Sequence, residues 1–240
     1  MIRSLLVRGM LTGILAGLIV FAFARLVGEP EVDRAIAFET AQDQSKGEAA
    51  ETPIVTRPTQ KGLGLLTGTI VYSIALGGIF GLVFAYAQGR YAITEPRPLA
   101  ALIALLGWLS IVLIPTLKYP ANPPAVGDPA TIGIRTAAYF LLIALSLATL
   151  TLPFQLNRRL TPHLGTWNAA ISASAIYVLL VAILYKLLPV IDEVPKDFPA
   201  TLLWRFRIAS WGMQAVLFAT IGLIFGFLTE RDQNTHRQEA

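Results

Sequence analysis

Residues 63–88, LGLLTGTIVYSIALGGIFGLVFAYAQ, specify the fold class of this chain. They lie between Lys61 and Arg90, in a stretch of 28 residues without a charged side chain. A helix needs roughly 20 apolar residues to cross a hydrocarbon layer of about 30 Å. The stretch therefore predicts a transmembrane helix.

The same pattern recurs along the chain, in five further charge-free gaps of 16 to 26 residues. The composition agrees with it, because 55% of the 240 residues are hydrophobic, only 14% are charged and the mean hydropathy is +0.62. We expect an all-α, polytopic membrane protein with one membrane domain over residues 1–240, built as a bundle of six helices. The predicted spans are about 9–28, 63–88, 98–117, 132–153, 167–188 and 206–228.

The first predicted span has a second interpretation. A basic start, an apolar run and then Ala22-Phe23-Ala24 also resemble a secretory signal, whose cleavage would remove residues 1–24 and leave five spans. Gly9, Gly13 and Gly17 favour retention, because glycines four residues apart let helices pack closely. The same spacing recurs in three pairs, for which packing within the chain or between copies competes with backbone lining a pore. These pairs are Gly64 and Gly68, Gly77 and Gly81, and Gly222 and Gly226.

The charges predict the orientation. The connections 88–98 and 154–166 are compact and basic, and the N-terminal tail carries Arg3 and Arg8. Basic segments stay on the cytoplasmic side, so we expect cytoplasmic termini. The other three connections then share the external face, and they would stay together if the orientation were inverted.

These three external connections carry acids and prolines, as in 118–129, KYPANPPAVGDP. Prolines stiffen the backbone, and carboxylates are hard oxygen donors for divalent cations. For any single acid, solvation or pairing with an arginine is the alternative, and Asp128-Pro129 also fits a helix N-cap. The candidate metal ligands are Glu29, Asp33, Glu39, Asp128, Asp192, Glu193 and Asp197.

The first external connection begins with a predicted short helix. Pro30 suits its first turn, and Glu29 and Asp33 would then share one helical face at a spacing of four residues. Residues 40–61 are polar and low in aromatic side chains, so they predict a flexible external linker.

Several functions are disfavoured by what the chain lacks. It has no cysteine, two histidines (His163 and His236), no carboxylate in the middle of a span and no phosphate-binding G-x-x-x-x-G-K-[ST] motif. Inside the spans, Asn168 and Gln214 are the strongest candidates for polar contact with an ion, and hydrogen bonding between helices explains either residue equally well. Neither a nucleophile–base set nor a histidine cluster falls on one face, so we expect no enzyme acting on lipid. The basic residues flank apolar runs and do not predict nucleic-acid binding.

Three blocks resemble signature blocks of the CbtA family, the probable cobalt transporter subunits of bacteria. They are 36–39 (IAFE), 118–136 (KYPANPPAVGDPATIGIRT) with Tyr139-Phe140 beyond it, and 193–212 (EVPKDFPATLLWRFRIASWG). The resemblance covers essentially the whole chain. It implies a multi-pass protein of the bacterial inner membrane that transports cobalt(II), without a permanently bound cofactor. It also implies a very small one-span partner, CbtB, with a short histidine motif.

Cobalt(II) readily takes imidazole ligands, and the three acidic connections on the external face of this chain carry no histidine. We therefore expect the partner to bring the histidines, although oxygen ligands and retained water are the alternative. The sequence leaves open whether the chain also forms a homo-oligomer. A non-transporting membrane scaffold is the competing function, in which the glycines and the stiff loops serve only to bind partners.

Overall fold

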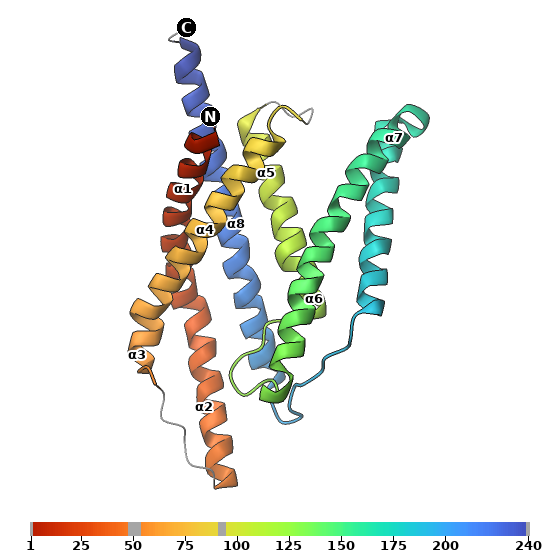
Figure 1. The fold of residues 1–240 in the computed structure, drawn as a ribbon. Helices are drawn as coiled ribbons and strands as arrows, with labels where there is room; N and C mark the ends of the chain where they lie inside the picture. Colours follow the sequence, from red (N-terminus) through yellow and green to blue (C-terminus); the bar gives the residue numbers. More distant parts are fainter. Residues whose placement is uncertain (1, 48–53, 91–94, 239–240) are drawn as a thin grey trace. The chain divides into compact units, whose positions relative to one another are not determined.

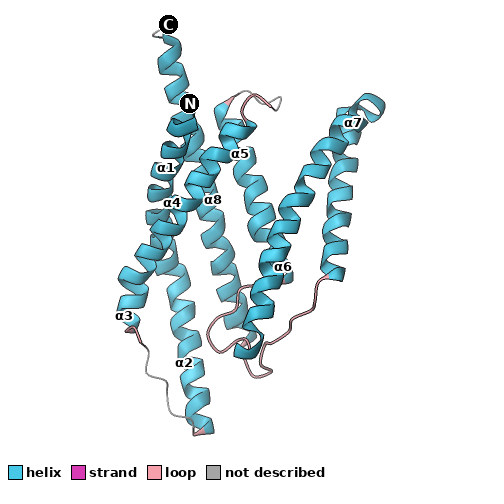
Figure 2. Ribbon diagram, viewed as in Figure 1, coloured by secondary structure: helices cyan, strands magenta, loops and turns pink. Residues whose placement is uncertain are grey.

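The computed structural model describes residues 2–47, 54–90 and 95–238, with the side chains from 236 onward left aside. Throughout these ranges the regular structure is helical (Figures 1 and 2). The helices are α1 (Ile2–Phe23), α2 (Glu29–Lys46), α3 (Arg57–Thr59), α4 (Leu65–Ala87), α5 (Pro96–Gly107), α6 (Ile114–Lys118), α7 (Ile132–Leu187) and α8 (Ala200–Gln238). Three π-helical turns, η1 (Ala24–Gly28), η2 (Gln60–Gly64) and η3 (Trp108–Leu113), and a 3₁₀ turn, η4 (Pro129–Thr131), complete the set.

Five helical stretches of the described residues are long and apolar enough to cross a membrane. The prediction of an all-α, polytopic membrane protein is confirmed. The fourth stretch, Pro129–Leu187, contains both the fourth and the fifth predicted spans. It reverses direction at Gly165, whose φ of 75° and ψ of 165° favour glycine (Figure 1).

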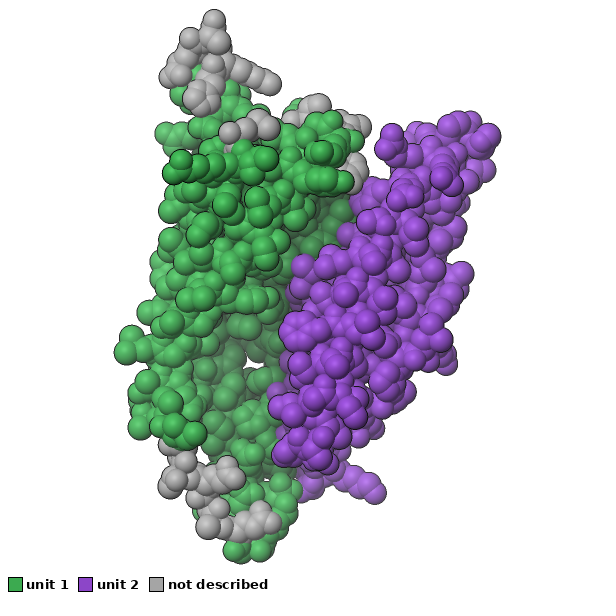
Figure 3. Space-filling view, viewed as in Figure 1, with its two compact units in different colours: residues 1–108, 123–125, 199–240 green, residues 109–122, 126–198 purple. Residues whose placement is uncertain are grey.

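Within what we expected to be one membrane domain, the described chain forms two compact units (Figure 3). Unit 1 comprises residues 1–108, 123–125 and 199–240, and unit 2 comprises residues 109–122 and 126–198. Helices α1, α2, α4, α5 and α8 therefore belong to unit 1, and α6 and α7 belong to unit 2.

A glycine seam joins α1 to α4 in unit 1. A Cβ atom on Gly9 would lie 2.1 Å from the Gly77 carbonyl oxygen, and one on Gly13 would lie 2.3 Å from that of Ser73. A Cβ atom on Gly81 would lie 2.5 Å from the Leu5 carbonyl oxygen. The packing interpretation of these glycines is therefore confirmed within the chain.

The remaining core of unit 1 lies where α8 meets α4 and α5. The Phe225 ring contacts Phe80 and Phe84, with centroids 5.2 and 5.0 Å apart, in edge-to-face geometry. One turn before Phe225, a Cβ atom on Gly222 would lie 2.5 Å from that of Ala104 in α5. Gly68 has open space around it, so it makes no such close approach within the described chain.

Prolines explain two of the π turns. Pro30 lacks a backbone N–H and its ring crowds the carbonyl four residues earlier, which normally ends a helix. Here η1 widens the helix by one residue per turn, and the Glu29 N–H donates to the Ala24 carbonyl. Helices α1 and α2 therefore continue into each other, where the sequence predicted a separate short helix. The turn η3 precedes Pro115 in the same way.

In unit 2, the two arms of α7 pack beside α6. Leu142 is fully buried, and the Tyr185 hydroxyl donates to the Ile114 carbonyl. The Tyr119 hydroxyl donates to the Pro189 carbonyl at 2.8 Å, which ties the connection after α6 to the connection after α7. The third and fifth predicted connections are therefore held together inside this unit.

The predicted linker 40–61 begins and ends in helical segments, since α2 continues to Lys46 and α3 starts at Arg57. Helix α2 ends at Gly47, which adopts a left-handed φ of 74°. Residues 48–53, the middle of the linker, lie outside the described residues. Its flexibility stays a prediction.

Candidate functional site

The first group of candidate ligands lies at the start of α2, in unit 1. Glu29 and Asp33 are four residues apart and both contact Arg57. The Arg57 Nε atom lies 2.9 Å from Asp33 Oδ1, and Lys61 Nζ lies 3.1 Å from Asp33 Oδ2. The prediction that these two acids share one helical face is confirmed, and the structure adds the cations that balance them.

Glu31 belongs to the same turn, and the sequence analysis left it out of the ligand set. Its exposed fraction is 9%, one carboxylate oxygen accepts from Arg34, and Oε2 is buried without a partner among the described residues. A buried, unsatisfied carboxylate oxygen is costly unless a cation or a donor reaches it. No sequence pattern marked Glu31, because its burial depends on how α2 packs within unit 1.

Glu39 lies two helical turns further along α2 and is half-buried. It completes the three candidate ligands that unit 1 holds. We refer to Glu29 and Asp33, which share one side of the helix, as the acidic face of α2; Glu31 stands two residues from each and therefore lies on the opposite side.

The second group lies in unit 2, where the third and fifth predicted connections meet. Glu193 Oε2 accepts from the Asp128 backbone N–H at 2.8 Å and lies 3.3 Å from Arg135 Nε. The Thr131 hydroxyl donates to the other carboxylate oxygen. The pKa of Glu193 is lowered from its ordinary value, first by the Thr131 hydrogen bond and then by the Asp128 N–H. The Glu193 carboxylate therefore joins the fifth predicted connection to the third by hydrogen bonds and an ion pair, and we call this arrangement the Glu193 clamp.

Asp128 has the capping role that the sequence offered as an alternative. Its Oδ1 accepts from the Ala130 backbone N–H at 2.8 Å, and Pro129 occupies the first turn of η4. The N-cap interpretation is confirmed. Asp192 and Asp197 are exposed. Unit 2 therefore holds four of the seven candidate ligands, and Asp128 and Glu193 take part in the hydrogen bonds that join the two connections.

No three histidine or carboxylate side chains of the described residues lie close enough together to hold a metal ion. The acidic face of α2 and the Glu193 clamp are separate groups that belong to different units. Their role as cation ligands stays a hypothesis.

Polar side chains inside the predicted spans form one small group in unit 2. The Tyr177 hydroxyl lies 3.5 Å from both Ser110 and Ser146, and the two serines are completely buried. In unit 1, Gln214 keeps a buried Oε1 atom without a partner among the described residues, whereas Asn168 of unit 2 is exposed. Serine and tyrosine hydroxyls are weak neutral ligands, so this group fits helix–helix hydrogen bonding better than tight cation binding.

Comparison with known proteins gives one result. A family model described as probable cobalt transporter subunit (CbtA) matches residues 2–230. Comparison with curated proteins and with solved structures gives no match.

Proposed function

Because the chain belongs to the CbtA family of probable cobalt transporter subunits, we propose that it moves cobalt(II) across the bacterial inner membrane. The observation that carries the proposal is the extent of the match, which covers four of the membrane-length helices and most of the fifth. The family consists of transporter subunits and is not an enzyme family. In this proposal cobalt(II) is the cargo and the helix bundle forms its path.

The acidic face of α2 is the first place where the cation binds. Glu29 and Asp33 are held on one side of the helix, where both carboxylates contact Arg57. An incoming divalent cation replaces Arg57 and Lys61 as the counter-charge, because it brings two positive charges to the same oxygens. In this proposal the cation is captured by acids that already lie together, and it takes the place of the arginine and lysine side chains that now neutralise them.

Unit 1 also supports the orientation. Arg8 and Glu29 are 21 residues apart on the continuous helix α1–η1–α2, which corresponds to roughly 30 Å along the axis, the thickness of the hydrocarbon layer. The basic end, with Arg3 and Arg8, faces the cytoplasm, and the acidic face of α2 lies on the external side. The termini are therefore cytoplasmic in this proposal.

A subunit implies a partner. Oxygen donors alone suit cobalt(II) less well than mixed oxygen and imidazole ligands. We assign the missing imidazoles to a small one-span subunit of the CbtB type. Asp128, Asp192, Glu193 and Asp197 then attract the cation to the external surface of unit 2, where their charge raises its local concentration.

Uptake of radioactive cobalt by cells that express the chain with a histidine-bearing one-span partner tests the proposal. We expect Glu39→Gln and Asp197→Asn each to lower uptake about tenfold at subsaturating cobalt, as a loss of about 1.4 kcal/mol of cation binding predicts. Asp43→Asn is the matched control, since Asp43 lies on α2 outside the candidate set.

Two results contradict different parts of the proposal. Unchanged uptake in both variants removes the capture role of the loop acids and leaves transport intact. Absence of cobalt uptake by the unaltered chain with its partner removes transport itself and favours the scaffold function.

A further inference from the structure

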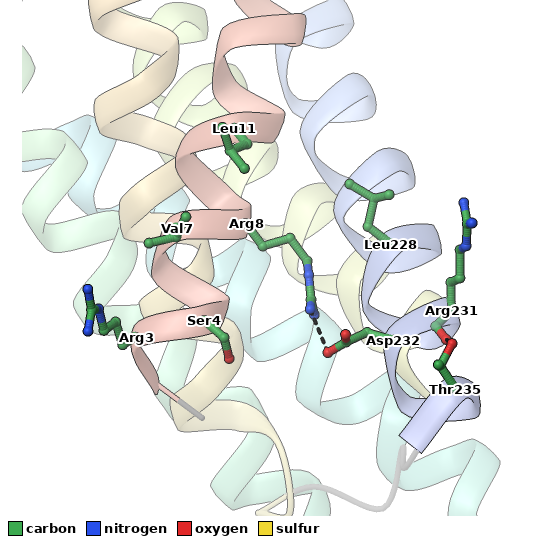
Figure 4. A pocket seen from close by; sticks show the side chains of 9 residues that line it. All are labelled: Arg3, Ser4, Val7, Arg8, Leu11, Leu228, Arg231, Asp232 and Thr235. Atoms are coloured by element: carbon green, nitrogen blue, oxygen red, sulfur yellow. Dashed lines mark hydrogen bonds and ion pairs between the residues drawn. The ribbon is translucent and has the colours of Figure 1, made fainter. Parts of the chain in front are cut away.

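A groove between α1 and α8 lies at the end of unit 1 opposite the acidic face of α2. It is open to its surroundings and has a volume of about 790 Å³. Figure 4 shows the residues that line it. Helix α1 contributes one face with residues at i, i+4 and i+8, and α8 contributes residues at i, i+3, i+4 and i+7. The lining residues are Arg3, Ser4, Val7, Arg8 and Leu11 of α1, and Leu228, Arg231, Asp232 and Thr235 of α8.

The groove changes from basic to apolar along its length. Arg3 lies at the aqueous end of α1, and Leu11 lies about 12 Å deeper along the helix axis. On α8 the order is the same, with Thr235 and Arg231 at the outer end and Leu228 deeper. The deeper residues Leu11 and Val7 expose 59% and 46% of their surface. A charged headgroup followed by a hydrocarbon chain matches this order.

The charged side chains that line the groove favour an anionic ligand. Arg8, whose side chain is only 15% exposed, is bound to Asp232 at 2.6 Å and to the Thr229 hydroxyl at 3.1 Å (Figure 4). That pair is neutral and joins the two helices at the base of the groove. Among the described residues, Arg3 and Arg231 have no ion-pair partner, so two positive charges remain, one on each side of the groove (Figure 4).

The neighbouring face of α8 shows what a satisfied arginine looks like in this unit. Arg97 lies 2.6 Å from Glu230 and its guanidinium stacks over the Phe227 ring. No comparable carboxylate or ring of the described residues engages Arg3 or Arg231. Excess positive charge therefore distinguishes the groove from this neighbouring face.

We propose that this groove binds the phosphate headgroup of an anionic phospholipid, with one acyl chain along Val7, Leu11 and Leu228. Arginine is suited to the role, because its guanidinium donates two parallel hydrogen bonds to phosphate oxygens. Basic pockets between transmembrane helices on the cytoplasmic side are typical sites for anionic headgroups. The bound lipid would fill the space between α1 and α8, with its negative charge between the two unpaired arginines that flank the groove.

Lipid binding to the delipidated full-length protein in a neutral detergent tests this site, with native mass spectrometry as the readout. We expect phosphatidylglycerol to bind about thirty-fold more tightly than phosphatidylcholine, and the double variant Arg3→Gln, Arg231→Gln to abolish that preference. The single variant Arg231→Gln should lower it about fivefold. The double variant Arg90→Gln, Arg158→Gln removes the same charge at exposed positions elsewhere and should keep the preference.

Three results overturn the proposal. Equal binding of the two lipids by the unaltered protein excludes an anionic headgroup site. A phosphatidylglycerol preference that survives loss of Arg3 and Arg231 places the lipid elsewhere. Displacement of phosphatidylglycerol by millimolar inorganic phosphate shows that the groove takes the free ion and that the apolar part contributes nothing. Thermal unfolding of each variant checks that it is folded. If the double variant is unfolded, the fivefold effect expected for the single variant Arg231→Gln tests the proposal.

Discussion

Replacing Gly9 by alanine should loosen the seam between α1 and α4. The added Cβ atom would lie 2.1 Å from the Gly77 carbonyl oxygen and 2.9 Å from its carbon, and both are backbone atoms. An ordinary contact begins near 3.4 Å, so one helix has to move by more than 1 Å. Such overpacking costs about 3 kcal/mol at the upper end of the usual range. Alanine returns about 1 kcal/mol of helix propensity, which leaves a net loss of about 2 kcal/mol.

Gly68→Ala is the matched control, because Gly68 also lies in α4 and an added Cβ atom there would have no neighbouring atom within 4 Å. This substitution carries the propensity gain without the clash, so it should stabilise by up to about 1 kcal/mol. The two variants therefore differ by about 3 kcal/mol, more than a hundredfold in the unfolding equilibrium.

Reversible unfolding in mixed micelles of dodecyl maltoside and sodium dodecyl sulfate, followed by tryptophan fluorescence and circular dichroism, measures the difference. Equal stability of the two variants, or a more stable Gly9→Ala, would mean that α1 and α4 do not meet at this seam and that the packing explanation is wrong. A Gly13→Ala variant should behave like Gly9→Ala, since its Cβ would lie 2.3 Å from the Ser73 carbonyl oxygen.

Two further predictions concern the charged groups. The pKa of Glu193 is lowered from its ordinary value of 4.5, so its contribution to stability is complete above pH 4.5 and is lost as the pH falls through the folded-state pKa. Glu193→Gln should therefore destabilise at pH 7 and become indistinguishable from the unaltered protein at low pH, as pH-dependent unfolding will show; a constant difference would contradict the assignment. Arg57→Gln should cost about 1–3 kcal/mol, because it leaves the Glu29 carboxylate, 11% exposed, without its ion pair. Arg34→Gln should cost less in the same denaturation assay, because Arg34 is 53% exposed and pairs with one carboxylate, whereas Arg57 is 25% exposed and pairs with two; the reverse order would contradict this argument.

The long charge-free stretches could be read in advance because they depend on local composition and length alone. Every predicted span falls in or against a helix, including the two arms of α7 that turn at Gly165. The N-cap at Asp128 and the shared face of Glu29 and Asp33 were also within reach, since both depend on residues a few positions apart.

The candidate site was only partly predictable. Arg57 lies 24 residues after Asp33, and nothing in that spacing shows that the two side chains meet. Glu31 was not among the predicted ligands, because its burial depends on how the helix packs. The continuous passage from α1 into α2 was missed as well, because a π turn relieves the clash that Pro30 would otherwise cause.

Residue patterns alone were enough to establish that this protein crosses the membrane several times as helices, and they led to the CbtA family. Both conclusions rest on contiguous residues, because apolar runs satisfy the bilayer and signature blocks are read letter by letter. The folded chain was needed to learn which acids are paired, which one is buried and where arginines line a groove. Those properties depend on contacts between residues far apart in the chain, such as Arg8 with Asp232, and no local pattern encodes them.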